Sequence, residues 1–183
     1  PPPLNTPPAD PTDLDTAYAT WKAQAPVVNG RTPIVLVASQ GGASRAGYWT
    51  AEVLAVLHEE TGGQLPRSIF AISAVSGGSL GAVGYVAAVG DNPQIGLDEI
   101  EPAMDALVAD DFLSPAVGSL LFPDLAQRFL PVAFLPDAAS GLEGGFEASW
   151  ASRCPAWDCR APDLFAQPFM SLYPRTPGTP WRP

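Results

Sequence analysis

The stretch Pro33-Ile34-Val35-Leu36-Val37-Ala38 is a run of apolar, branched residues, and the glycine-rich loop Gln40-Gly41-Gly42-Ala43-Ser44-Arg45-Ala46 follows it almost directly. The same order returns further along the chain, where Ile69-Phe70-Ala71-Ile72 precedes the loop Ser73-Ala74-Val75-Ser76-Gly77-Gly78-Ser79. Continuous apolar runs of this length predict strands that are covered on both faces of a sheet. The chain therefore predicts two buried strands, each leading into a glycine-rich loop.

Helices are predicted after each loop. Between Ala46 and Thr61, apolar residues recur at helical spacing, and Gly62-Gly63 follows as a C-terminal cap would; the spaced residues are Trp49, Val53, Val56 and Leu57. Small and apolar residues from Leu80 to Val89 predict a second helix packed on the sheet. This βαβα order predicts an α/β fold with a parallel sheet flanked by helices, joined by a right-handed crossover.

Prolines are concentrated at both ends of the chain and recur in its second half. The proline-rich residues 1–11 predict a stiff linker from an upstream element, residues 12–167 the domain, and residues 168–183 a proline-rich connection. Asp10 as N-cap and Pro11 at the first helical position predict a leading helix that runs to about Ala25. Between Leu97 and Trp150 a helical segment is interrupted by prolines, and its apolar clusters would form either a lipid-facing lid or ordinary core packing.

Length and charge limit the classes of function. A chain of 183 residues with 46% hydrophobic residues is long enough to form one domain with a core. Its formal charge of −10 argues against a nucleic acid partner and against simple attraction to anionic membranes. The weakly polar stretch 78–90 is too short to cross a bilayer, so the sequence predicts no membrane span.

The second loop resembles the nucleophile elbow G-x-S-x-G, with Ser76 as the serine and Ala74 in place of the first glycine. Parallel strands would bring both loops to one carboxyl edge of the sheet. Backbone N–H groups of Gly41, Gly42, Ala43 and Gly77 would then form an oxyanion hole for an ester attacked by Ser76. Arg45 is placed to hold the loop or to meet a phosphate, although the glycines do not fit the dinucleotide pattern G-x-G-x-x-G.

A serine nucleophile also needs a general base that accepts its hydroxyl proton. A triad needs a histidine, and the single histidine, His58, has Glu59 and Glu60 beside it, which predicts a solvated surface position. A Ser-Asp dyad would need no histidine. Without a base, Ser76 would be a weak nucleophile.

These two loops, with Arg45, Ala46, Tyr48 and Trp49 after the first, resemble the bacterial type of the patatin-like phospholipase family. The resemblance implies a three-layer α/β/α fold without cofactor or metal, and hydrolysis of lipid esters as a phospholipase A, lipase or lysophospholipase. By position, Gly41, Gly42 and Ala43 match the family's three glycines, and Ser76 matches its nucleophile. Ala43 and Ala74 depart from glycine, and an alanine at positive φ would be strained.

The resemblance also implies a dyad aspartate followed by glycine. No aspartate after Ser76 precedes a glycine, so this base is expected beyond Pro183, and residues 12–167 are expected to be an incomplete, inactive part of the domain. The implied partner is a lipid or phospholipid substrate. The resemblance also implies peripheral membrane contact, and a segment upstream of residue 1 would associate the protein with the membrane. The alternative is a catalytically silent module of the same fold that binds acyl chains or phosphate.

Cys154 and Cys159 are separated by four residues and could close a small disulfide loop or remain two free thiols. A zinc site is not expected, because the chain offers no further cysteine or histidine ligands near them.

Overall fold

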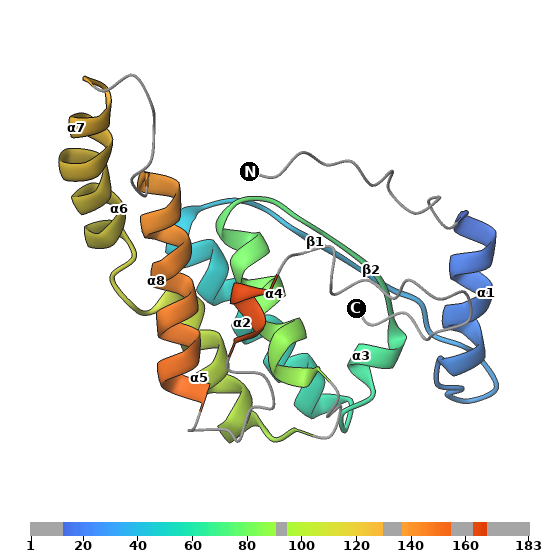
Figure 1. Ribbon diagram of the computed structural model, residues 1–183. Coiled ribbons are helices and arrows are strands. Elements are labelled where there is room, and N and C mark those ends of the chain that lie inside the picture. Colours follow the sequence, from blue (N-terminus) through green and yellow to red (C-terminus); the bar gives the residue numbers. More distant parts are fainter. Residues whose placement is uncertain (1–12, 91–94, 130–136, 155–162, 168–183) are drawn as a thin grey trace.

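The computed structural model describes residues 13–90, 95–129, 137–154 and 163–167 and is a mixed α/β structure, mostly helical, around a small parallel sheet (Figure 1). The predicted proline-rich linker and connection lie in residues 1–12 and 168–183, outside the described residues. In chain order the elements are α1 Leu14–Gln24, β1 Val35–Ser39, α2 Ala43–Glu60, α3 Leu65–Ser68, β2 Ile69–Ala74, α4 Gly77–Val89, α5 Leu97–Val108, α6 Leu113–Ser119, the π-helical turn η1 Leu120–Asp124, α7 Leu125–Gln127, α8 Ala138–Arg153 and the 3₁₀ turn η3 Leu164–Ala166.

The predicted βαβα unit is present. β1 and β2 pair in parallel, with Val37 opposite Ile72 and Ser39 opposite Ala74, so the two strands end side by side. The register shifts by one residue near the start, because Val35 pairs with Ile69 whereas Leu36 pairs with Ala71. Phe70 is the extra residue of this bulge, and it allows both Ile69 and Ile72 to pack against the core.

The expectation that both strands are covered on both faces is wrong for the described residues. Burial alternates along β1 and β2, and Leu36 is 69% exposed on the uncovered side. On the other side, Val37 and Ile72 pack against the core that α2, α4 and α5 build. A two-stranded sheet with helices on one side buries only one side-chain row of each strand.

Glycines bring α2 and α4 unusually close together. A Cβ built on Gly81 would overlap the backbone oxygen of Gly47, and one built on Gly47 would lie 2.9 Å from the oxygen of Gly77. The buried face of α2 is accordingly made of small residues and one leucine, namely Gly47, Thr50, Ala51, Leu54 and Ala55, together with His58. Close approach of the two helix backbones thus selects the small face of α2 for burial.

The larger apolar residues of α2 lie outside. Trp49 is 70% exposed and Val56 is 48% exposed, and Val53 and Leu57 share this outer face. The helical spacing of these residues predicted the helix correctly, but they mark its exposed face rather than its packed one. Gly62 and Gly63 follow the helix at φ 59° and 76°, which confirms the predicted glycine end.

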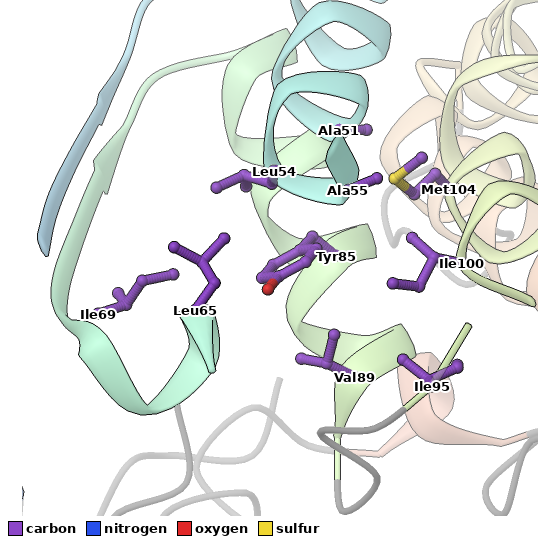
Figure 2. Close-up of a cluster of buried hydrophobic side chains, with 10 residues drawn as sticks. All are labelled: Ala51, Leu54, Ala55, Leu65, Ile69, Tyr85, Val89, Ile95, Ile100 and Met104. Carbon is purple, nitrogen blue, oxygen red and sulfur yellow. The ribbon is translucent and has the colours of Figure 1, made fainter. Parts of the chain in front are cut away.

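The main core lies between the sheet and the helices. Leu54 and Ala55 of α2, Tyr85 of α4, and Ile100 and Met104 of α5 meet there, as Figure 2 shows. Leu65 and Ile69 close one side of this cluster, and Val89 and Ile95 lie at its far end (Figure 2). The core holds the two helices that follow the glycine loops in fixed positions.

The leading helix begins later than predicted. Its N-cap is Asp13, whose carboxylate accepts a hydrogen bond from the Thr16 backbone N–H at 3.0 Å, so Asp10 is not the cap. α1 packs on the start of β2 through Phe70, whose ring lies 5.9 Å from Tyr18 and 5.4 Å from Trp21 between centroids. Phe70, the bulged residue, thus anchors α1.

The segment from Leu97 onward is helical as predicted, but the prediction that prolines interrupt it is wrong at Pro102, Pro115 and Pro123, which lie inside α5, α6 and η1. The break between α5 and α6 is at residues 109–112 instead. Pro131 and Pro136 lie outside the described residues. A second cluster, comprising Ala88, Ala103, Ala106, Trp150 and Cys154, joins α8 to α4 and α5. At its edge Asp110 accepts hydrogen bonds from Ser149 and Arg153, which lower the pKa of the Asp110 carboxyl.

By length and composition alone, one helical stretch of the described residues, Leu97–Gln127, is long and apolar enough to cross a membrane, which the sequence analysis did not foresee. Its first part is α5, whose Ile100, Ala103 and Leu107 are buried in the protein. That part is therefore a core helix in this structure.

Candidate active site

The two glycine-rich loops meet at one edge of the sheet. β1 ends at Ser39 and β2 at Ala74, and the chain leaves both strands toward a helix. A Cβ built on Gly41 of the first loop would lie 3.1 Å from the Ser76 Cβ and 3.7 Å from its Oγ. The first loop therefore lies directly against the serine of the second.

The second loop has no space for a side chain at Gly77 and Gly78, the two residues that follow Ser76. A Cβ on Gly77 would overlap the carbonyl oxygen of Ala43, and one on Gly78 would overlap the Gln40 oxygen and the Ser39 Oγ. Ser39 is itself held by a 2.5 Å hydrogen bond between its Oγ and Thr50 Oγ1. The glycines after Ser76 are thus required by close contact between the two loops.

Ser76 has a strained backbone. It precedes α4 with φ 54° and ψ −129°, a conformation that glycine adopts easily and other residues rarely. Its side chain is exposed, and it has no hydrogen bond to any described residue. Strain of this kind costs about 1–3 kcal/mol and is concentrated at functional sites. A sharp turn between strand and helix is the geometry expected of a nucleophile elbow.

Ala43 shares this strain, with φ 52° at the start of α2. The departure from glycine at this position therefore has the backbone cost that the sequence predicted. Ala74, by contrast, is the last residue of β2 and has no positive φ. Of the two departures from glycine, only the one at Ala43 strains the backbone.

Four backbone N–H groups are available at this edge. Those of Gly41, Gly42, Ala43 and Gly77 donate no hydrogen bond within the described part of the chain. The next two N–H groups of the second loop are used, because Gly78 donates to the Val75 oxygen and Ser79 to the Ser76 oxygen. Ala43 and Gly77 open α2 and α4, where helix N-termini carry partial positive charge. The edge can therefore accept negative charge beside Ser76.

Arg45 lies in the first turn of α2 and is exposed. Among the described residues it forms no ion pair. A positive charge in the first turn opposes the helix dipole by a few tenths of a kcal/mol, so Arg45 does not serve the stability of α2. Its guanidinium is free to bind an anionic group at this edge.

His58 is not at the surface, and the prediction of a solvated histidine is wrong. It is 3% exposed, and its Nδ1 lies 3.0 Å from the hydroxyl of Tyr85. Burial lowers the pKa of His58, and a smaller effect of the Ile95 backbone raises it. Burial also raises the pKa of the Tyr85 hydroxyl. Glu59 and Glu60 are exposed, whereas His58 lies on the small-residue face of α2 that packs on α4.

No described residue supplies a base to Ser76 through a hydrogen bond, and the described part of the chain holds no cluster of histidine, cysteine and carboxylate side chains that could bind a metal. His58 is occupied by Tyr85 in the core. The residues brought together are thus a nucleophile and hydrogen-bond donors, without the proton acceptor.

A pocket of about 250 Å³ opens next to the first turn of α4, and apolar atoms line it almost entirely. Ser79, Leu80 and Val83 of α4 form one wall, and the remaining lining residues are Leu107, Glu143, Phe146, Glu147 and Phe165. None of these residues was predicted from the sequence. They come from four separate elements, and no local pattern in the sequence links them.

Cys154 is disulfide-bonded, which agrees with the disulfide alternative; Cys159 lies outside the described residues.

Comparisons of the chain with family models, with curated proteins and with solved structures found no match.

Proposed function

We propose that this chain carries the nucleophile and the oxyanion hole of a serine acyl hydrolase that acts on lipid esters. The observation that carries the proposal is the contact between Gly41 and a strained, exposed Ser76 at the carboxyl edge of a parallel strand pair. Placing donors within reach of a nucleophile is what acyl transfer requires.

In the proposed reaction the Ser76 oxygen attacks the ester carbonyl and forms a new C–O bond. The hydroxyl proton passes to the base and then to the departing alcohol. The negative oxygen of the intermediate accepts hydrogen bonds from the N–H groups of Gly41, Gly42, Ala43 and Gly77. Water then attacks the acyl-enzyme, releases the fatty acid and restores the serine.

The pocket beside α4 supports a lipid substrate. Ser79 and Leu80 line it one turn beyond Ser76, so an acyl chain bound there would hold its carbonyl close to the nucleophile. An apolar lining favours an alkyl chain over a polar acyl group. The free guanidinium of Arg45 would bind a headgroup phosphate where the substrate is a phospholipid.

The proposed base is an aspartate beyond residue 183, as the resemblance to patatin-like phospholipases implies. We propose that it completes a Ser-Asp dyad and that the complete domain is a three-layer α/β/α structure. The exposed sheet face around Leu36 and the exposed outer face of α2 are consistent with such a larger domain.

One observation favours a second candidate function. Ser76 has no proton acceptor among the described residues, as would hold for a catalytically silent module that binds acyl chains or phosphate. Such a module would use the same pocket and Arg45 for binding. Its ligand would bind equally well after Ser76→Ala, because no bond to the serine forms.

A fluorophosphonate probe, applied to the full-length protein, separates the two candidates. We expect covalent labelling and hydrolysis of a short-chain ester, both lost in Ser76→Ala, because only an activated serine reacts with the probe. Ser73→Ala is the matched control, since Ser73 lies exposed on β2 and should leave labelling unchanged. Binding of a fatty acid without any labelling would refute the hydrolase and support the silent module.

A further inference from the structure

The segment 113–129, which we call the outer arm, comprises α6, η1 and α7 and exposes an unusual number of large apolar side chains. Phe129 is 83% exposed, Phe122 75% and Leu113 71%. Further exposed apolar residues on the outer arm are Val117, Leu120, Leu121 and Leu125. Contiguous exposed apolar surface of this kind marks an interaction site rather than ordinary surface.

The polarity of the outer arm is inverted relative to a helix of a soluble protein. Two of its polar residues face α8: a Cβ on Gly141 would overlap Ser119 Oγ, and the Asp124 carboxylate accepts a hydrogen bond from the Ala138 N–H at 3.2 Å. Ser114 and Arg128 are exposed. An ordinary surface helix turns its apolar stripe inward and its polar side outward. The contact with α8 therefore fixes an orientation in which the apolar side points away from the protein.

The outer arm connects to the candidate active site through α8. α6 packs along α8, and Figure 1 shows the arm on the outer side of that helix. Glu143, Phe146 and Glu147 of α8 line the pocket that also contains Ser79 and Leu80. One helix thus has the outer arm on one side and the proposed acyl pocket on the other.

Charge selects the kind of surface that the outer arm can meet. The chain carries a formal charge of −10, whereas within the arm the only charged residues are Asp124 and Arg128, one of each sign. An anionic membrane would repel the molecule as a whole, and a neutral zwitterionic surface would not. The arm is therefore complementary to an uncharged lipid surface.

The outer arm is too short to span a bilayer. From Leu113 to Gln127 its helical turns cover about 15 residues, or about 22 Å at 1.5 Å per residue. The hydrocarbon core of a bilayer is about 30 Å thick, and the preceding helix α5 is buried in the protein core. The outer arm can therefore bind a membrane only by lying in the plane of the membrane–water interface.

We propose that the outer arm docks on a zwitterionic lipid surface, with its exposed apolar side chains inserted below the headgroups, namely Leu120, Leu121, Phe122, Leu125 and Phe129. This inference rests on the proposed function for its purpose, since it would bring the acyl pocket to a membrane-borne substrate. Docking itself does not depend on Ser76. The two proposals can therefore fail separately.

Flotation of the full chain with phosphatidylcholine vesicles tests the docking. We expect wild type and Ser76→Ala to float equally and the triple variant Leu121→Gln, Phe122→Gln, Phe129→Gln to lose binding by about tenfold per side chain, because each buries apolar surface in lipid. The matched control is Val53→Gln, Val56→Gln, Leu57→Gln, which removes exposed apolar side chains from α2 and should not change flotation.

Several results would overturn the docking proposal. These are absence of flotation in wild type, equal loss in both triple variants, and binding to vesicles of anionic lipid alone. A shift from dimer to monomer in the arm variant, without vesicle binding in wild type, would assign the arm to a second copy of the chain. Flotation that persists without any serine labelling would leave the docking intact and refute the hydrolase.

Discussion

At the scale of single residues, the candidate site depends on glycines, whose lack of a side chain allows the two loops to touch. Gly77 and Gly78 allow the second loop to touch the backbone of the first, and Gly41 leaves room beside the Ser76 hydroxyl. Ser76 itself is held at φ 54° by these contacts. The geometry of the site is therefore set by glycines whose substitution would push the loops apart.

A pair of substitutions in α4 tests this dependence. Gly77→Ala should lower the free energy of unfolding by about 3 kcal/mol or more, because its Cβ would overlap the Ala43 carbonyl oxygen, a backbone atom that cannot move aside. Gly84→Ala should be neutral or stabilise by up to about 1 kcal/mol, because its Cβ would lie 3.5 Å from Leu107 in ordinary contact. Urea denaturation measures both, and equal effects would show that α2 and α4 are not packed this closely.

At the scale of elements, α2 shows how packing chooses a helix face. The large apolar residues Trp49 and Val53 are outside, and Ala51, Ala55 and His58 are inside against α4. Periodicity in the sequence favours the face with the larger hydrophobic residues. Here the close approach of glycines on α4 leaves space only for the small face.

His58 makes the stability of this helix pair sensitive to pH. Burial lowers the pKa of His58 from the ordinary value of 6.5. Below that pH the unfolded chain therefore binds a proton at His58 more readily than the folded protein does. The free energy of unfolding should therefore fall as the pH drops below about 6.5, with a slope of at most about 1.4 kcal/mol per pH unit. Carboxyls such as Asp110, with pKa values held below 3.8, lose their stabilising contribution only at much lower pH.

Urea denaturation at pH 7.5, 6.5 and 5.5 measures this effect. His58→Phe, which retains a buried ring, should flatten the profile in that window. Tyr85→Phe should lower stability by about 1 kcal/mol at pH 7.5, because the His58 nitrogen loses its hydrogen-bond partner. A flat profile in the wild type would show that His58 is accessible to water.

At the scale of the whole molecule, two apolar clusters join the αβ unit to the later helices. The first holds α2, α4 and α5 beneath the sheet, and the second fixes α8 through Trp150, which is 1% exposed and whose ring centroid lies 4.9 Å from that of Phe165. Because α8 also carries the outer arm and lines the pocket, the second cluster positions both.

Two tryptophan substitutions test that role. Trp150→Ala should lower the free energy of unfolding by about 3–5 kcal/mol, because it leaves a large cavity in the second cluster. Trp49→Ala should change it by no more than about 0.5 kcal/mol, because this side chain is 70% exposed on α2. Chemical denaturation of the oxidised protein measures both, and a small effect of Trp150→Ala would mean that α8 is held mainly by other contacts.

The sequence alone determined the local elements of this protein. Apolar runs ending in glycine-rich loops predicted β1, β2 and their parallel pairing, helical spacing predicted α2, and the near match at Ala74 to Gly78 predicted the turn at Ser76. The pairing follows from the βαβ order of the elements. Each of the other features depends on residues close together in the chain, whose backbone preferences act locally.

Only the tertiary structure decided which surfaces are covered. It buried His58, exposed Trp49 and Leu36, left the apolar side chains of the outer arm exposed, and assembled the pocket from elements far apart in the sequence. The physical reason is that burial depends on how closely two backbones can approach. Here that approach is set by Gly47 of α2 and by Gly77 and Gly81 of α4, and a pattern of large apolar residues along α2 does not reveal which of its faces meets these glycines.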